Sequence, residues 1–374
     1  MPGTSRQRRQ LRLISVTSLL RENALNLLLV FVPVSVALML SRAPHLWIFL
    51  TSALAIIPLS GLIGRATEEL ADHFGPGIGG LLNATFGNAT ELIIALFALH
   101  AGLFEVVKAS ISGSIISNIL LVLGGSMLVG GWGRDKQVFN RTNAGASASM
   151  LFLAVVALVM PAVFDLTITG SLRETDIPPI RAFSLLVAVV LMLTYFASLV
   201  FSLKTHRSLL TVDLPEVRAI PRLSIQNAVI LLLAASVLTA IESELLVGTI
   251  EAATKALGMT EFFVGIIVVA IIGNAAEHFS AVMLARKNRM ELAVTIATSS
   301  ATQIALFVAP VLVFVSFAFG HPMTLIFNAF EVVGITCSVF ILAFVSLDGE
   351  SNWFEGLQLI AVYLVLAIVF FFVR

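Results

Sequence analysis

Two short strings that each end in a glutamate occur in the two halves of the chain, Gly87-Asn88-Ala89-Thr90-Glu91 and Gly273-Asn274-Ala275-Ala276-Glu277. Each string lies near the middle of a long apolar run. An ionisable side chain at the depth of a lipid bilayer costs roughly 2.5–3.5 kcal/mol on insertion scales. Two such costs at matching positions predict a functional site around Glu91 and Glu277. A structural hydrogen bond between helices is the simpler alternative.

The polar neighbours of the two glutamates follow the same spacing in both halves. Asn88 precedes Glu91 by three residues, and Asn274 precedes Glu277 by three, so each pair shares one helix face. The next apolar run in each half carries hydroxyl and amide groups: Ser110, Ser114, Ser117 and Asn118 in the first, and Ser299, Ser300, Thr302 and Gln303 in the second.

Carboxylate, amide and hydroxyl oxygens are ligands for a hard cation. Ca²⁺ takes 6–8 oxygen ligands in a flexible geometry, whereas Zn²⁺ and Cu²⁺ favour His and Cys. Only His278 adjoins the strings, and the single cysteine, Cys337, lies elsewhere. Two nearby carboxylates balance one divalent ion and titrate as a pair. Metal and protons would therefore compete for the same oxygens, which predicts obligatory antiport.

Other roles remain open for the residues around the two glutamates. Asn88 and Asn274 could cap broken helices instead of binding metal. Serines in membrane helices often serve as small packing residues. His278 follows Glu277 directly, about 100° round the helix, so it could orient that glutamate or bind the cation.

The composition is that of a membrane protein. Apolar residues make up 58% of the 374 residues and charged residues only 12%, compared with about 25% charged residues in soluble domains. The zero net charge and the lack of an internal basic tract with aromatic residues give no sign of nucleic-acid binding. The lone cysteine excludes an internal disulfide and a cysteine-based zinc site. The expected partner is a lipid bilayer.

Apolar runs of about 20 residues predict transmembrane helices. The chain has eleven such runs, and we expect an all-α membrane protein with spans near 23–41, 45–63, 77–101, 104–130, 143–163, 181–203, 223–245, 260–286, 290–318, 323–347 and 353–373. With the N-terminus in the cytoplasm, sixteen of the 22 Lys and Arg residues fall on the cytoplasmic side. This distribution follows the positive-inside rule and places the C-terminus outside.

The second half of the chain repeats the first. A constant offset of 186 residues aligns Gly87 with Gly273, Glu91 with Glu277, and Ser114 with Ser300. Five spans per repeat is an odd number, so the second repeat crosses the membrane in the opposite sense, as in many secondary transporters. The predicted organisation is a cytoplasmic tail and peripheral first span (1–44), a first repeat (45–203), a cytoplasmic linker (204–222) and a second, inverted repeat (223–374).

The strings above resemble the two signature repeats of the calcium/proton exchangers (CAX-type) of the Ca²⁺/cation antiporter superfamily. Further strings that carry the resemblance are Gly113-Ser114-Ile115-Ile116-Ser117-Asn118 and Ser299-Ser300-Ala301-Thr302-Gln303. The resemblance covers essentially the whole chain in layout and is densest over 61–131 and 242–315. It implies a sodium/calcium-exchanger-like fold and Ca²⁺/H⁺ exchange by alternating access, without an enzymatic activity or a cofactor.

The resemblance also implies roles for individual residues. Glu91 and Glu277 would be the central carboxylates for metal and protons. The accessory ligands would be Asn88, Asn274, Ser114, Ser300 and Gln303. His278 would tune the coupling, and Glu68 and Glu251 match acidic residues at the mouths of the site. Glu68, together with Glu69 and Asp72, could equally form a solvated helix face.

The chain departs from many eukaryotic members of this group. It has no long N-terminal regulatory tail, and its linker before the seventh span is not an acidic run. These features favour a prokaryotic plasma membrane over a vacuole. Homo-oligomerisation stays open.

Three other functions remain as alternatives. Exchange coupled to Na⁺, or a broader exchange of Mn²⁺, Na⁺ or K⁺ for H⁺, would use the same kind of site. A cation channel would arrange its glutamates as a ring, which one inverted pair does not provide. An intramembrane hydrolase is disfavoured because the chain has no His-Glu-x-x-His and no Gly-x-Ser-x-Gly string.

Overall fold

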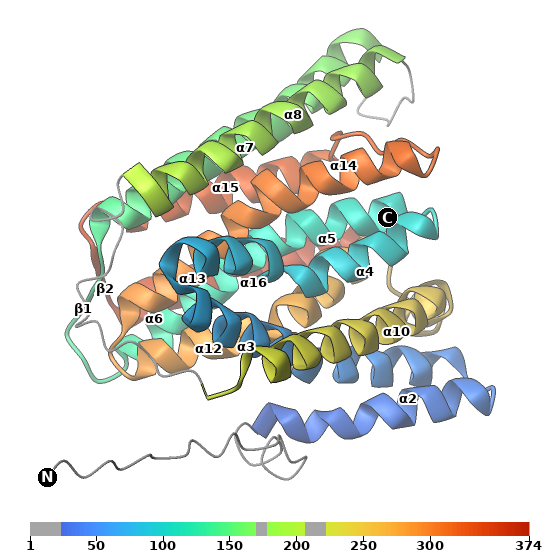
Figure 1. Cartoon of the computed structure of the whole chain (residues 1–374). Coiled ribbons are helices and arrows are strands. Elements are labelled where there is room, and N and C mark those ends of the chain that lie inside the picture. The colour runs from blue at the N-terminus through green and yellow to red at the C-terminus, as the bar shows by residue number, and fades with distance from the viewer. Residues whose placement is uncertain (1–23, 170–177, 206–221, 374) are drawn as a thin grey trace, which may run out of the picture.

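The protein was analysed as a computed structural model, which describes residues 24–169, 178–205 and 222–373. These residues form a bundle of helices with one two-stranded ribbon at one end (Figure 1). The predicted N-terminal tail and most of the predicted 204–222 linker lie outside the described residues.

The first half of the bundle contains long apolar helices, some of them joined end to end through short 3₁₀ or π segments. In chain order its elements are η1 (Ala24–Val30), α2 (Phe31–Leu40), α3 (His45–Phe86), α4 (Ala89–His100), α5 (Phe104–Ile116), η2 (Ser117–Val122), α6 (Leu123–Gly131), β1 (Gln137–Val138), α7 (Arg141–Thr169), α8 (Pro178–Val200) and η3 (Phe201–Thr205).

The second half has a similar succession of elements. They are α10 (Ile225–Leu257), α11 (Glu261–Phe263), η4 (Val264–Val269), α12 (Ala270–Arg286), α13 (Met290–Gln303), η5 (Ile304–Val308), α14 (Ala309–Ala318), α15 (Ala329–Val345), β2 (Glu350–Ser351) and α16 (Trp353–Phe372).

Every predicted span coincides with a helical segment, but the segments differ in length. Within the described residues, eight helices are long and apolar enough to cross a membrane. The other three predicted positions hold shorter apolar helices, Leu25–Leu40, Ala89–His100 and Ala329–Val345. The all-helical membrane architecture is therefore confirmed, while the count of eleven crossings stays a prediction.

The helix that begins at His45 is longer than the sequence suggested. It continues past the predicted end at residue 63 to a kink at Gly75, where φ is 77° and ψ is 178°. This left-handed backbone favours glycine because a Cβ atom would be strained there. The chain then turns back and stays helical to Phe86, so Glu68 and Glu69 belong to the same helix as the second predicted span.

The helix that leads to Glu91 is interrupted, whereas its counterpart in the second half is not. Asn88 lies between α3 and α4 with non-helical angles, φ −105° and ψ 29°. In contrast, α12 runs without a break through Gly273 and Asn274, and it is preceded by the π segment η4. The two halves therefore share a sequence motif but hold it in different backbone conformations.

Two π segments coincide across the repeats. The η2 segment, shifted by the 186-residue offset, falls on residues 303–308 and matches η5 at Ile304–Val308. Single-turn π segments are rare and often lie beside functional sites. Here they follow directly on the helical turns that carry Ser114 and Ser300.

The two halves come into close contact where α5 crosses η4. A Cβ atom on Gly113 would lie 2.0 Å from the carbonyl oxygen of Ile266, and one on Gly265 would lie 2.9 Å from that of Val106. Only glycine fits at such distances. The crossing therefore fixes α5, with its serines, against the second repeat.

A small ribbon joins two loops at the end of the bundle opposite the His45 end of α3. β1 pairs antiparallel with β2, Gln137 opposite Ser351 and Val138 opposite Glu350. Lys136 Nζ lies 2.6 Å from Glu350 Oε1, and this carboxylate raises the pKa of the exposed lysine. Exposed pairs contribute little to stability, so the main-chain pairing is the more important link.

The first helix lies at the edge of the molecule. In Figure 1, α2 packs beside α3 and α10 on one side of the bundle, while α7 and α8 lie on the opposite side. α3 and α10 make the most extensive helix pair of the structure. The helices with the two repeated strings, α4 and α12, lie in the interior with α5 and α13.

Candidate functional site

The two repeated glutamates meet in the interior of the bundle. Glu91 lies in the first turn of α4, directly after the helix break, and Glu277 lies within α12. Glu91 lies against Gly273, which precedes Glu277 by one turn of α12. Gly273 allows this approach, because a Cβ atom there would be 3.1 Å from Glu91 Cγ. The prediction that the two glutamates face one another is consistent with this arrangement.

One part of the surrounding polar network starts at Asn88. Its Nδ2 donates to Gln303 Oε1 at 2.7 Å, and its Oδ1 accepts from Ser300 Oγ at 3.0 Å. Asn88 occupies the N-cap position of α4, but its side chain caps no helix. Asn88 therefore stands at the start of the helix, as the capping alternative expected, but its side chain does not cap the helix. The side chain instead contacts α13.

The other part of the network is centred on Asn274. Its Nδ2 donates to Ser114 Oγ and to the Ala270 carbonyl oxygen, both at 2.9 Å. Its Oδ1 accepts from Asn118 Nδ2 at 3.0 Å. Asn118 Nδ2 also lies 3.0 Å from Ser300 Oγ, which joins the two parts. All five predicted accessory residues thus belong to one hydrogen-bonded network.

Asn118 is the residue of this network that the sequence analysis did not place among the ligands. It is fully buried, and from the first half of the chain it donates to Asn274 and Ser300 of the second half. The 186-residue offset aligns it with Ile304, so it has no polar counterpart in the second half of the chain. Its position one residue after Ser117, in the quoted motif, was the signal that could have found it.

Several buried polar atoms of the site have no hydrogen-bond partner among the described residues: Glu277 Oε2, His278 Nε2 and Asn118 Oδ1. Unsatisfied buried polar atoms are rare in folded proteins and call for a bound water, ion or functional reason. Two of these three atoms are oxygens, one in the carboxylate of Glu277 and one in the amide of Asn118, which contacts Asn274. The donor set therefore has free capacity for a small cationic guest.

A large cavity of about 660 Å³ reaches Glu277 from one end of the bundle. Near the glutamate it is lined by Ser299, Ser300 and Gln303. Towards the end that carries the linker, its lining includes Arg65, Glu68, Glu69, Asn83 and Arg222. Water and ions can therefore approach Glu277 from the linker end.

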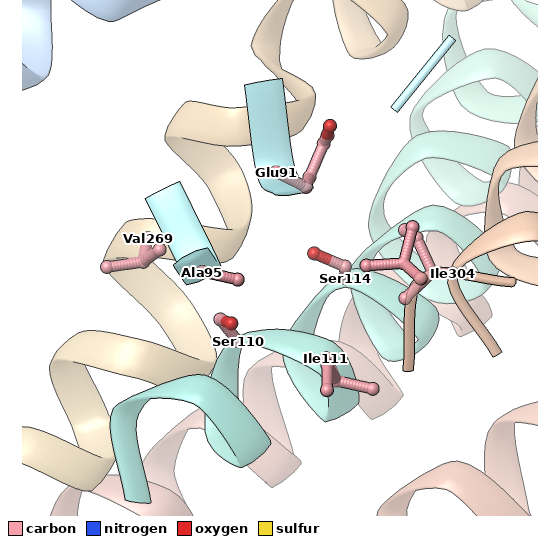
Figure 2. Close-up of a pocket in the computed structure, with 8 residues that line it drawn as sticks. Glu91, Ala95, Ser110, Ile111, Ser114, Val269 and Ile304 are labelled. Carbon is pink, nitrogen blue, oxygen red and sulfur yellow. The ribbon is translucent and has the colours of Figure 1, made fainter. Parts of the chain in front are cut away.

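The space on the other side of Glu91 is nearly closed. A pocket of only about 10 Å³ is lined by Glu91, Ser110 and Ser114 together with apolar side chains of Ala95, Ile111, Val269, Ile304 and Val308. In Figure 2 the carboxylate of Glu91 points away from Ser110 and Ser114, and the side chains of Ile111, Val269 and Ile304 crowd the pocket. On this side of Glu91 the described residues therefore leave almost no open space.

The two residues predicted at the mouths lie in different surroundings. Glu68 is exposed and lines the large cavity. Glu251 lies on the surface of α10, where its Oε1 is 2.6 Å from Lys255 Nζ, and it lines neither cavity. A gating role for either residue stays a prediction.

From the sequence, Glu69 was expected only as part of a solvated helix face. In the structure it binds the backbone that leads into α10. It is 8% exposed, and its Oε2 accepts the backbone N–H groups of Arg222 at 2.8 Å and Leu223 at 2.9 Å. His73 Nε2 lies 2.7 Å from the Leu223 carbonyl oxygen. α3 therefore holds the start of the second repeat.

The donor set suits a hard cation better than a soft one. Within the described residues no three His, Cys, Asp or Glu side chains cluster as a preformed metal site. The interior instead offers two carboxylates and neutral amide and hydroxyl oxygens. Ca²⁺ accepts such mixed oxygen ligands in flexible geometry.

Comparison with known proteins points to the same kind of molecule. A family profile described as "Sodium/calcium exchanger protein" matches residues 44–204 and 227–372. A "Ca(2+)/H(+) antiporter" of Aphanothece halophytica is 46% identical over 359 residues, covering 92% of this chain and 95% of that one.

Solved structures support the comparison. "Structure of native YfkE" matches with a TM-score of 0.81 at 40% identity, covering 93% of this chain and all of the other. "Crystal Structure of H+/Ca2+ Exchanger CAX" matches with a TM-score of 0.69 at 16% identity, covering 96% and 93%. The predicted exchanger-like fold is confirmed, and the relatives are named as transporters, not enzymes.

Proposed function

Because this multi-pass membrane chain belongs to the sodium/calcium exchanger protein family, we propose that it exchanges Ca²⁺ for H⁺ across the membrane. The observation that carries this proposal is the position of the two repeated glutamates among neutral oxygens: Glu277 lines the inner part of a deep cavity, and Glu91 lies against Gly273, one helical turn before Glu277. The similar antiporter of Aphanothece halophytica supports the choice of the two ions.

Competition for the two carboxylates would couple the ions. Two ionised carboxylates in a water-poor interior repel each other, and a divalent cation or added protons relieve the repulsion. Asn88, Asn274, Ser114, Ser300 and Gln303 would supply further oxygens, and His278 would tune the coupling. Several of these oxygens now accept hydrogen bonds from one another, so we expect the network to rearrange when Ca²⁺ binds.

Alternating access would move the bound ion between the two faces. The large cavity on the linker side and the nearly closed pocket beyond Glu91 are what one end state of such a cycle would require. With the N-terminus and the linker in the cytoplasm, this state would face inward. We place the protein in a prokaryotic plasma membrane, with Glu68 and Glu251 near the inner and outer mouths.

A second candidate is exchange of a broader set of cations. Amide and hydroxyl oxygens also bind Mn²⁺, Na⁺ and K⁺, and the site holds no feature that rejects a monovalent ion outright. Ca²⁺ transport that is driven by a pH gradient in sodium-free buffer would indicate coupling to H⁺ and not to Na⁺. Competition by Mn²⁺, Na⁺ and K⁺ in the same assay measures selectivity.

The proposal is tested in proteoliposomes with a pH gradient. An acidic lumen should drive Ca²⁺ uptake by the wild-type protein, and Glu91→Gln or Glu277→Gln should reduce it at least about 100-fold, because each removes a charge that balances the cation. Uptake is followed with ⁴⁵Ca²⁺ in sodium-free buffer.

The matched control is Glu355→Gln, which changes a carboxylate in the capping box of α16, away from the site. This variant should transport at close to the wild-type rate. If the wild type takes up Ca²⁺ at the same rate with and without the pH gradient, H⁺ coupling is refuted. Persistent uptake by both Glu91→Gln and Glu277→Gln would refute the assignment of the carboxylates.

A further inference from the structure

A third carboxyl group lies deep in the membrane-spanning part of the protein, away from the exchange site. Glu242, near the middle of α10, has a relative exposure of 0%. It lines neither of the two cavities described above. Its side chain instead faces the peripheral helix α2, where Ser35 Oγ lies 2.7 Å from Glu242 Oε1.

The surroundings of Glu242 are polar but incompletely paired. Thr239 shares its helix face, since it lies three residues before Glu242, and Ser243 follows Glu242 directly. Thr239 Oγ1, Ser243 Oγ and Glu242 Oε2 are all buried without a hydrogen-bond partner among the described residues. By contrast, Thr249 on the same helix donates to the Leu245 carbonyl oxygen at 2.7 Å.

Glu242 faces few ionisable groups on the described helices that pack against α10. On α4 these groups are Glu91 and His100. The α2 helix contains no charged residue, and α3 has none from Leu46 to Gly64. On α10 the nearest ionisable group is Glu244, which is exposed and points about 200° away round the helix. An isolated ionised carboxylate at this depth would be costly.

The hydrogen-bond geometry around Ser35 fits a neutral, protonated Glu242 better than an ionised one. Ser35 Oγ lies 2.9 Å from the Val32 carbonyl oxygen as well as 2.7 Å from Glu242 Oε1. A serine hydroxyl has one proton to donate, so an ionised Glu242 would leave one of these two oxygen pairs without a hydrogen. A carboxylic acid that donates to Ser35 Oγ satisfies both, because Ser35 can then donate to Val32.

We propose that Glu242 is a proton-binding site separate from the Glu91–Glu277 pair, and that its neutral acid form fastens α2 to α10 through Ser35. This clasp joins a helix outside the two repeats to α10, which packs along α3. It holds while the acid keeps its proton and opens when alkaline pH ionises the carboxyl group. The free hydroxyls of Thr239 and Ser243 complete the polar surroundings of this acid.

Infrared difference spectroscopy of the purified full-length protein tests the proposal. The wild type should show the carbonyl stretch of a protonated carboxylic acid that is absent in Glu242→Gln and retained in Glu244→Gln. This band should persist in saturating Ca²⁺, which separates it from any band of Glu91 or Glu277. Its absence, or its loss on Ca²⁺ addition, would overturn the proposal, whatever the outcome of the transport assays.

Two further variants keep the test independent of how well Glu242→Gln folds. Ser35→Ala should shift the frequency of the band, because the acid loses its acceptor; an unshifted band would contradict the clasp. Glu242→Gln, which mimics the neutral acid, should lose less thermal stability between neutral and alkaline pH than the wild type. Stabilisation of the wild type, but not of Glu242→Gln, by Na⁺ or K⁺ alone would instead indicate a cation site.

Discussion

Gly273 shows how a single missing side chain sets the position of a functional group. The Cγ atom of Glu91 occupies the space beside the Cα atom of Gly273, so the two repeats approach each other closely beside the carboxylates. The same closeness would let both carboxylates contact one ion. The glycine in the repeated string is thus explained by packing across the repeats as well as by local backbone freedom.

We therefore expect Gly273→Ala to reduce Ca²⁺ uptake while the protein stays folded. The added methyl group would lie 3.1 Å from Glu91 Cγ, so the carboxylate must shift by a few tenths of an ångström. Small displacements of this kind cost about tenfold in rate when geometry is strict. Initial uptake rates in proteoliposomes measure the effect.

The matched control is Gly145→Ala on α7, where an added Cβ would meet nothing within 4 Å. Its uptake should equal that of the wild type. Equal rates for Gly145→Ala and Gly273→Ala would show that the position of Glu91 tolerates the shift.

At the scale of the elements, the joint between α3 and α10 links the two halves of the chain. Glu69 accepts the backbone N–H groups of Arg222 and Leu223, which directly precede α10. His73 contacts the carbonyl oxygen of Leu223. These contacts hold the N-terminal end of α10 beside the mouth of the large cavity.

Removal of the acceptor should weaken this joint. In Glu69→Ala the buried N–H of Leu223 loses its partner, which costs about 1–3 kcal/mol. The melting temperature in detergent should fall, whereas Asp72→Ala, which removes an exposed carboxylate one turn further along α3, should leave it nearly unchanged. Identical melting curves for both variants would mean that the joint contributes nothing to stability.

At the scale of the whole molecule, access to the site is one-sided. The cavity that reaches Glu277 leads to the linker end, and the pocket beyond Glu91 is too small to admit an ion with its water shell. The unequal backbones of the two repeats, broken at Asn88 and continuous at Asn274, accompany this asymmetry. In the opposite state of an alternating-access cycle the two repeats would exchange these roles.

Cysteine labelling tests this one-sided access. In a Cys337→Ser background, which removes the chain's only cysteine, Ala276→Cys should react with a membrane-impermeant thiol reagent. Ala276 lines the large cavity. Labelling should occur only from the face that carries the linker, and saturating Ca²⁺ should slow it.

Ala95→Cys is the control for the closed side, since Ala95 lines the small pocket and is 4% exposed. It should remain unlabelled from both faces under the same conditions. Equal labelling of Ala95→Cys and Ala276→Cys would mean that the two sides are open together, as in a channel.

The sequence alone determined the membrane class and the positions of the helical segments, and it predicted residues that the structure brings together in the interior. Apolar runs and turn residues are local signals, so they predict helices without knowledge of the fold. The internal repeat then supplied long-range information. Because matching strings in two inverted repeats are expected to lie together, it pointed to Glu91 and Glu277 with their neighbouring asparagines and serines.

The tertiary structure decided what no repeat could show. Asn118 has no counterpart in the second half, yet it joins Asn274 to Ser300. Glu69 is buried against the other repeat, and Glu242 pairs with a helix outside both repeats. These contacts join residues 154 to 207 positions apart. Local spacing carries no signal for them, because each depends on how helices pack.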